Sequence, residues 1–201
     1  SSTYGPVSVV AITFVIIALA EVADTSGLVT LVLATRFPAR WVLLGVCAGM
    51  LVHVGIAVAA GSLVGLLPER PLEAILAVMF LIGAALTLRE GLEDDDDDDD
   101  DDAEREAPRT RWAVVATAFG ITALSELADP SQILTATLTA QYGDPLLVGI
   151  GALLGLWAVS ALAVYGGNRL RRVVPVKWVA VVAAAIMVVL AVISAVQAIR
   201  G

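Results

Sequence analysis

Six long apolar segments constrain this chain more than any other feature. They cover residues 7–35, 41–68, 71–88, 112–140, 145–168 and 178–199. A membrane-spanning helix needs about 20 mostly apolar residues, and the continuous rather than alternating runs favour helices over a β-barrel. Hydrophobic residues make up 59% of the chain, against roughly 45–50% in soluble domains, so lipid must cover part of the surface. We therefore expect an all-α polytopic membrane protein with six transmembrane helices.

The basic residues between these segments predict how the chain is oriented in the membrane. The connections after spans one, three and five contain Arg36, Arg40, Arg89, Arg105, Arg109, Arg111, Arg169, Arg171, Arg172 and Lys177. The opposite side has only Arg70 and Arg200. Because cytoplasmic loops carry the excess of Lys and Arg, we expect both termini outside, the central connection in the cytoplasm, and a place in the cell membrane.

The central connection is strongly acidic and includes nine consecutive aspartates at residues 94–102. Like charges repel, so this run should be extended and disordered. It is interpreted either as a solvated linker or as a weak cation trap beside a transport entrance, and the sequence leaves both open. The acidic net charge of −8 arises here. No basic patch interleaved with aromatic residues is present, so nucleic-acid binding is not expected.

The chain contains an internal duplication. Residues 11–37 align without a gap with residues 116–142, and 11 of the 27 positions are identical. Continuing the alignment through Gly45 and Gly149 makes Trp157 the counterpart of His53. Three spans per repeat is an odd number, so the second repeat must enter the membrane inverted, an arrangement typical of secondary transporters. We expect a first repeat over 1–88, a cytoplasmic linker over 89–111 and a second repeat over 112–201.

Each repeat carries an acidic motif about halfway along its first span. The two motifs are Glu-Val-Ala-Asp-Thr-Ser at residues 21–26 and Glu-Leu-Ala-Asp-Pro-Ser at residues 126–131. A charged carboxylate at a helix centre costs roughly 2.5–3.5 kcal/mol, and no Lys or Arg lies within any predicted span. Protonated carboxyls could act as interhelical hydrogen-bond donors, but four acids in a duplicated pattern favour a functional site whose counter-charges are protons or bound cations.

These motifs define the candidate metal ligands. They are Glu21, Asp24, Thr25, Ser26, Glu126, Asp129, Ser131 and Gln132. Carboxylate, hydroxyl and amide oxygens suit Ca²⁺, Mn²⁺ or Mg²⁺. In the second motif, Pro130 lacks an N–H, so we expect a kinked span and a carbonyl of Glu126 left without its helical partner.

Span two contributes residues outside the motifs. Cys47 is interpreted as a packing residue, and His53 as a neutral buried imidazole, with a proton-relay role as the alternative. Glycines four residues apart at 45 and 49, and again at 151 and 155 in span five, permit close helix approach. We expect them to pack these spans against the motif helices.

At the motifs the sequence resembles the Gdt/transmembrane-protein-165 family of membrane Ca²⁺/Mn²⁺–H⁺ exchangers, which carry two copies of E-x-G-D-(K/R)-(S/T). The matching residues are Glu21, Asp24, Ser26, Glu126, Asp129, Ser131 and the following Gln132. Two positions depart from the family pattern, since Ala23 and Ala128 replace its glycine and Thr25 and Pro130 replace its basic residue. The resemblance implies exchange of Ca²⁺ or Mn²⁺ for protons through the paired acids.

The chemistry of the motifs agrees with that resemblance. Metal binding requires deprotonated ligands, so a divalent cation and protons compete for the same oxygens, and a site that opens alternately to each side would act as an antiporter. Sodium as the coupling ion would fit the same oxygens. The alternative is an intramembrane acid-pair enzyme of the aspartyl protease or lipid-phosphate phosphatase type. The inverted duplication and the absence of intramembrane Arg or Lys to hold phosphate favour a transporter, with no catalytic residues and no resident cofactor.

Overall fold

The computed structural model describes residues 5–23, 37–92, 110–127, 129–173 and 175–200, and all regular secondary structure in these segments is α-helical. The helices are α1 (Pro6–Ala23), α3 (Ala39–Val64), α4 (Glu69–Leu92), α5 (Arg111–Ser125), α6 (Pro130–Tyr142), α7 (Pro145–Val173) and α8 (Val176–Arg200). Five of them, α1, α3, α4, α7 and α8, are long and apolar enough to cross a membrane. Helices α5 and α6 meet at an angle of 69° and count as a sixth span if taken together. The expectation of an all-α polytopic membrane protein is confirmed.

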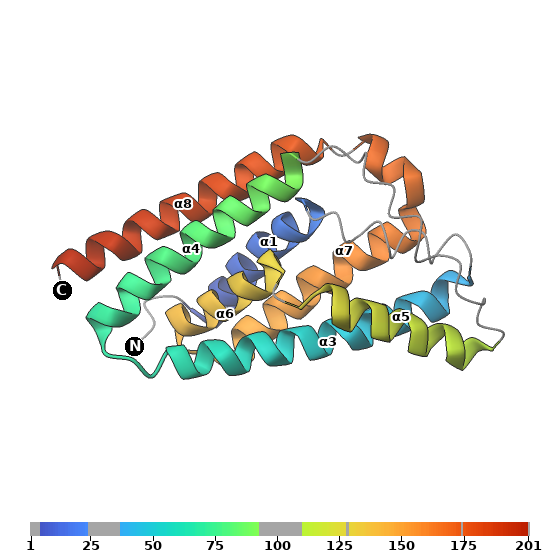
Figure 1. The fold of residues 1–201 in the computed structure, drawn as a ribbon, viewed down its shortest axis with the longest axis horizontal. Helices are drawn as coiled ribbons and strands as arrows, with labels where there is room; N and C mark the ends of the chain where they lie inside the picture. The colour runs from blue at the N-terminus through green and yellow to red at the C-terminus, as the bar shows by residue number, and fades with distance from the viewer. Residues whose placement is uncertain (1–4, 24–36, 93–109, 128, 174, 201) are drawn as a thin grey trace.

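The directions of the helices follow the inverted duplication. Figure 1 shows α1 leaving the end of the bundle that holds the N-terminus, α3 returning and α4 leaving again. Helix α5 begins at the opposite end, α7 runs back there, and α8 brings the C-terminus to the same end as the N-terminus (Figure 1). The second half therefore runs in directions opposite to those of the first.

The second helix of each repeat packs against the first helix of the other repeat. Helix α3 contacts α5 and α6, and α7 contacts α1. Glycines allow this approach, because a Cβ on Gly45 would lie 2.7 Å from the Cβ of Ala118 on α5. On α7, a Cβ on Gly151 would lie 2.9 Å from the Cβ of Thr13 on α1. The expectation that these glycines pack spans two and five against the motif helices is confirmed.

The same contacts establish how α3 and α7 correspond. A Cβ on Gly49 would lie 3.3 Å from the carbonyl oxygen of Phe119, and one on Gly155 would lie 3.1 Å from that of Phe14. Phe119 and Phe14 are matching residues of the duplication, so Gly49 and Gly155 occupy equivalent places. The offset between the repeats is thus 106 residues on these helices (155 minus 49).

This packing changes which residue of the second repeat is equivalent to His53. An offset of 106 pairs His53 with Val159, not with Trp157 as the sequence alignment suggested. Trp157 instead donates its indole N–H to the backbone carbonyl of Cys47 on α3, at 3.1 Å. Trp157 therefore ties the second helices of the two repeats together and does not stand in for the imidazole.

The junction between the repeats is described only at its edges. Helix α4 ends at Leu92 and α5 begins at Arg111, after Thr110 has capped it by accepting a hydrogen bond from the N–H of Ala113. Residues 93–109, with the aspartate run, lie outside the described residues. The expected linker over 89–111 stays a prediction.

Candidate cation site

The second acidic motif lies where α5 ends and α6 begins. Glu126 is the C-cap of α5, and Pro130 is the first residue of α6. A proline disfavours helical geometry in the residue before it, and Asp129 has the extended dihedrals φ −65° and ψ 153°. Pro130 thus sets the position of the break, and both acids lie beside non-helical backbone at the middle of a bent span. Broken helices of this kind line the binding sites of secondary transporters.

The structure adds one detail about this break. Because Pro130 has no N–H, the carbonyl of Glu126 has no i+4 helical partner, as expected. It accepts a hydrogen bond from the N–H of Asp129, three residues on, at 3.3 Å. A tighter i+3 turn therefore replaces the lost helical hydrogen bond. The carbonyl oxygen of Glu126 is already hydrogen-bonded within the backbone.

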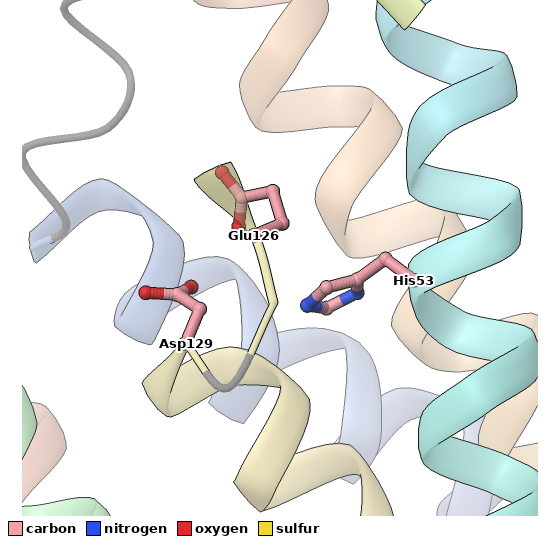
Figure 2. A group of neighbouring side chains, drawn as sticks. All are labelled: His53, Glu126 and Asp129. Carbon is pink, nitrogen blue, oxygen red and sulfur yellow. The ribbon is translucent and has the colours of Figure 1, made fainter. Parts of the chain in front are cut away.

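Three buried side chains that can bind a metal ion converge at the break. They are Glu126, Asp129 and His53, with exposed fractions of 3%, 8% and 2%. Each offers one ligand atom, and these atoms all lie within 4.8 Å of one another. Figure 2 shows the imidazole pointing from α3 toward the two carboxylates. Oxygens from the second repeat and a nitrogen from the first thus share one small volume.

Two residues predicted as ligands hold this group together. Ser131 Oγ donates a hydrogen bond to Asp129 Oδ2 at 2.8 Å and lies 3.4 Å from His53 Nε2. Gln132 Nε2 donates to the backbone carbonyl of His53 at 3.2 Å. Both side chains are buried, so the start of α6 is fastened to α3 at the level of the imidazole.

The two helix ends act differently on the acids. The N-terminal end of a helix carries partial positive charge and stabilises an anion, whereas the C-terminal end favours a cation. Asp129 lies at the N-terminal end of α6, and Glu126 at the C-terminal end of α5. The end of α5 therefore favours a cation between the two acids, whereas the end of α6 favours the negative charge of Asp129.

The first acidic motif is only partly described. Glu21 is buried, with 6% of its surface exposed, in the last turn of α1, and α1 contacts α6 and α7. It does not belong to the described group whose ligand atoms lie within 4.8 Å. Asp24, Thr25 and Ser26 lie outside the described residues. Convergence of the two motifs on one site stays a prediction.

His53 belongs to neither acidic motif and is not among the ligands predicted from the sequence. A signal for it exists in the spacing of α3, where every fourth residue is buried and all but the histidine are small. These residues are Gly45, Gly49, His53, Ala57 and Gly61. Gly49 packs against Thr122 of α5, and a Cβ on Gly61 would lie 2.8 Å from the Cβ of Thr139 of α6. The histidine lies between them on the face that meets both halves of the broken span.

Comparison with known proteins identifies the family. A family model described as "Divalent cation/proton antiporter GDT1" matches residues 9–95 and 114–201. The chain belongs to the GDT1 family. A GDT1-like protein, sll0615 of Synechocystis sp. (strain ATCC 27184 / PCC 6803 / Kazusa), is 28% identical over 192 residues, which are 89% of this chain and 92% of that protein. No solved structure matches the chain.

Membership of the GDT1 family decides the class of function. It confirms the resemblance seen at the two acidic motifs. The chain is a multi-pass membrane protein and a cation transporter, not an enzyme, and the ions of its family are a divalent cation and protons. The acid-pair enzyme considered as the alternative is therefore set aside.

Proposed function

We propose that the protein exchanges Mn²⁺ or Ca²⁺ for protons at a site built from Glu126 and Asp129 of the second repeat and Glu21 and Asp24 of the first. One observation carries the proposal. Two carboxylates are buried together at the break of a membrane span, within 4.8 Å of each other and of an imidazole. Thr25 and Ser26 would add hydroxyl ligands from the first motif, and Ser131 and Gln132 support the second.

Protons and a divalent cation are the exchangeable counter-charges that we propose for these acids. The predicted spans contain no Lys or Arg, and an ionised carboxylate at the bilayer centre is costly. A proton neutralises the carboxylate directly, and a divalent cation does so by coordination, but each needs the same oxygen atoms. Binding of one ion therefore displaces the other, which is the basis of exchange. Na⁺ could occupy the same oxygens, so the assay below includes a sodium gradient.

The fold supplies a way to expose the site alternately to the two sides. The acids lie at the 69° bend between α5 and α6, and α3 and α7 connect the two inverted repeats. Rocking of one repeat against the other around a fixed site is the usual movement of transporters with this architecture. We propose that the bend at Glu126 and Asp129 is the point about which the two halves of this span move.

The proposed orientation has both termini outside the cell membrane and the 89–111 linker in the cytoplasm. Arginine and tryptophan gather at the end of the bundle where α3 and α5 begin. The guanidinium of Arg40 lies 5.2 Å from the ring of Trp41, and that of Arg111 lies 5.6 Å from Trp41 and 5.8 Å from Trp112. Tryptophans anchor helices at membrane interfaces and arginines collect on the cytoplasmic side, so this end is proposed to face the cytoplasm.

The experiment is metal flux in proteoliposomes that contain only this protein and an internal pH dye. Mn²⁺ or Ca²⁺ entry should expel protons, with or without a sodium gradient. Glu126→Gln and Glu21→Gln preserve shape but remove a titratable charge, so each should abolish most of the flux without preventing insertion. Flux that survives both changes together, or that moves no protons under any gradient, would refute the proposal. Proton-independent flux driven by sodium would retain the site and replace the coupling ion.

A further inference from the structure

We propose that His53 is a direct ligand of the transported cation, and that its nitrogen makes the site select first-row transition-metal ions such as Mn²⁺ over Ca²⁺ and Mg²⁺. This inference rests on the proposed function, because it concerns the same site. It adds a residue that belongs to neither acidic motif, and it narrows the class of cation.

The spacing of the three side chains fits a single ion. Three atoms that lie no more than 4.8 Å apart leave a point within about 2.8 Å of each (4.8 Å divided by √3). Metal–nitrogen and metal–oxygen bonds in protein sites are about 2.0–2.6 Å long. A contraction of a few tenths of an ångström would therefore bring His53, Glu126 and Asp129 to bonding distance.

The surroundings of His53 hold the imidazole where a ligand must be. Gln132 fastens the backbone carbonyl of His53 to α6 at 3.2 Å. Ser131 orients Asp129 through the 2.8 Å hydrogen bond and lies against Nε2 of the imidazole. Outer partners of this kind orient metal ligands and tune their affinity. The small residues on either side of His53 on α3 let the helices approach closely enough for the ring to reach the carboxylates.

The nitrogen changes which ions the site prefers. Carboxylate oxygens bind Ca²⁺, Mg²⁺ and Mn²⁺ alike, whereas imidazole favours transition metals over the alkaline earths. Ca²⁺ also prefers six to eight oxygen ligands, and one of the three converging side chains here offers nitrogen instead. A mixed nitrogen and oxygen set at the break thus discriminates against Ca²⁺ on chemical grounds.

The second repeat offers no matching nitrogen ligand. The position equivalent to His53 is Val159, which has no ligand atom. The preference for Mn²⁺ over Ca²⁺ should therefore depend on one residue of α3 rather than on a pair related by the duplication. A single substitution at His53 should then change this preference.

His53→Gln is the decisive substitution, because it replaces the imidazole by a neutral side chain with an amide oxygen. Equilibrium binding of Mn²⁺ and Ca²⁺ is measured on the purified full chain at one fixed pH, and flux of both ions in proteoliposomes. Mn²⁺ affinity should fall roughly tenfold or more, the lower end of effects seen when metal sites lose a supporting group. Ca²⁺ affinity should change less than about threefold, because an amide oxygen is an ordinary Ca²⁺ ligand. Cys47→Ala, on the same helix outside the cluster, is the matched control and should alter neither affinity.

A spectroscopic measurement on the unsubstituted protein makes the test independent of folding effects. The chain contains one histidine, so ¹⁵N-histidine labelling of protein purified without a polyhistidine tag marks His53 alone. Pulsed electron paramagnetic resonance of bound Mn²⁺ should show hyperfine coupling to the labelled nitrogen.

Absence of that coupling, or an equal fall in Mn²⁺ and Ca²⁺ affinity in His53→Gln, would overturn the role of His53 as a selective ligand. Either result is compatible with flux that still depends on Glu126. If the proposed function itself is wrong, the result differs: the unsubstituted protein would then transport neither Mn²⁺ nor Ca²⁺, or its transport would not depend on Glu126.

Discussion

Substitution of Gly49 by alanine tests the helix packing that creates the site. A Cβ on Gly49 would lie 2.8 Å from the Cβ and Cγ2 atoms of Thr122, and ordinary contacts begin at 3.4 Å. Helices α3 and α5 would therefore have to separate by about 0.6 Å. Overpacking of this kind costs about 1–3 kcal/mol, and each kcal/mol lowers the melting temperature of a chain of this size by roughly 2–4 °C.

The same separation should weaken cation binding. His53 lies one turn beyond Gly49 on α3, and Glu126 follows Thr122 by four residues. The ligand atoms lie within 4.8 Å of one another, and two ligands on one cation can be no more than roughly 5 Å apart. A separation of about 0.6 Å would therefore move the most widely spaced atoms toward or past that limit. Gly49→Ala should thus lose both stability and transport.

Gly55→Ala is the matched control on the same helix. No atom lies within 4 Å of the Cβ that it would add, and alanine gains about 0.5–1 kcal/mol over glycine in a helix from lower backbone entropy. Apparent melting temperatures in detergent and Mn²⁺ flux in proteoliposomes are compared for both variants. If Gly49→Ala behaves like Gly55→Ala in both measurements, the reasoning about close packing is wrong.

Three further predictions concern the linker, the hydrogen bonds and the protons. Replacing the aspartates at 94–102 with an equally long neutral segment should preserve maximal flux and weaken apparent cation affinity only at low ionic strength, because screening acts over about 8 Å at physiological salt; a loss of maximal rate in correctly inserted protein would contradict this. Ser131→Ala removes one hydrogen bond to Asp129, worth about 1 kcal/mol, so Mn²⁺ affinity should fall about fivefold; a loss as large as that of Glu126→Gln would show that Ser131 is itself a principal ligand. Lowering the pH on the side from which Mn²⁺ binds should weaken its apparent affinity, since protons occupy the same oxygens; a binding curve that does not move with pH would argue against shared carboxylates.

Much of the fold could be predicted from the sequence because membrane spans are long and apolar. The break of the fourth span was also foreseeable, since Pro130 both lacks an N–H and restrains Asp129. The fate of the Glu126 carbonyl was not foreseeable, because the turn that satisfies it depends on how tightly the chain reverses between α5 and α6. The counterpart of His53 was misassigned because Gly45 was paired with Gly149, whereas the structure pairs it with Gly151. The equally spaced glycines at 45 and 49 and at 151 and 155 already carry the correct offset in the sequence.

The site was predictable only as far as its motifs reach. Glu126, Asp129 and Ser131 follow from the duplicated pattern and Gln132 from its place after the second motif, and the structure places all four around one break. His53 is remote in sequence and joins them through helix packing, which depends on contacts between glycines and backbone atoms of another helix. A polar residue in the middle of a stripe of small residues is the signal that would have indicated it.

The central claim, coupled exchange of a divalent cation for protons through Glu126, is tested most directly by using a proton gradient alone as the driving force. Proteoliposomes with equal Mn²⁺ on both sides and an acidic interior should accumulate Mn²⁺ against its own gradient as protons leave. Dissipating the proton gradient with a protonophore, or substituting Glu126→Gln, should abolish the accumulation. Mn²⁺ that only equilibrates in the unsubstituted protein, or accumulation that is unchanged in Glu126→Gln, would contradict the account.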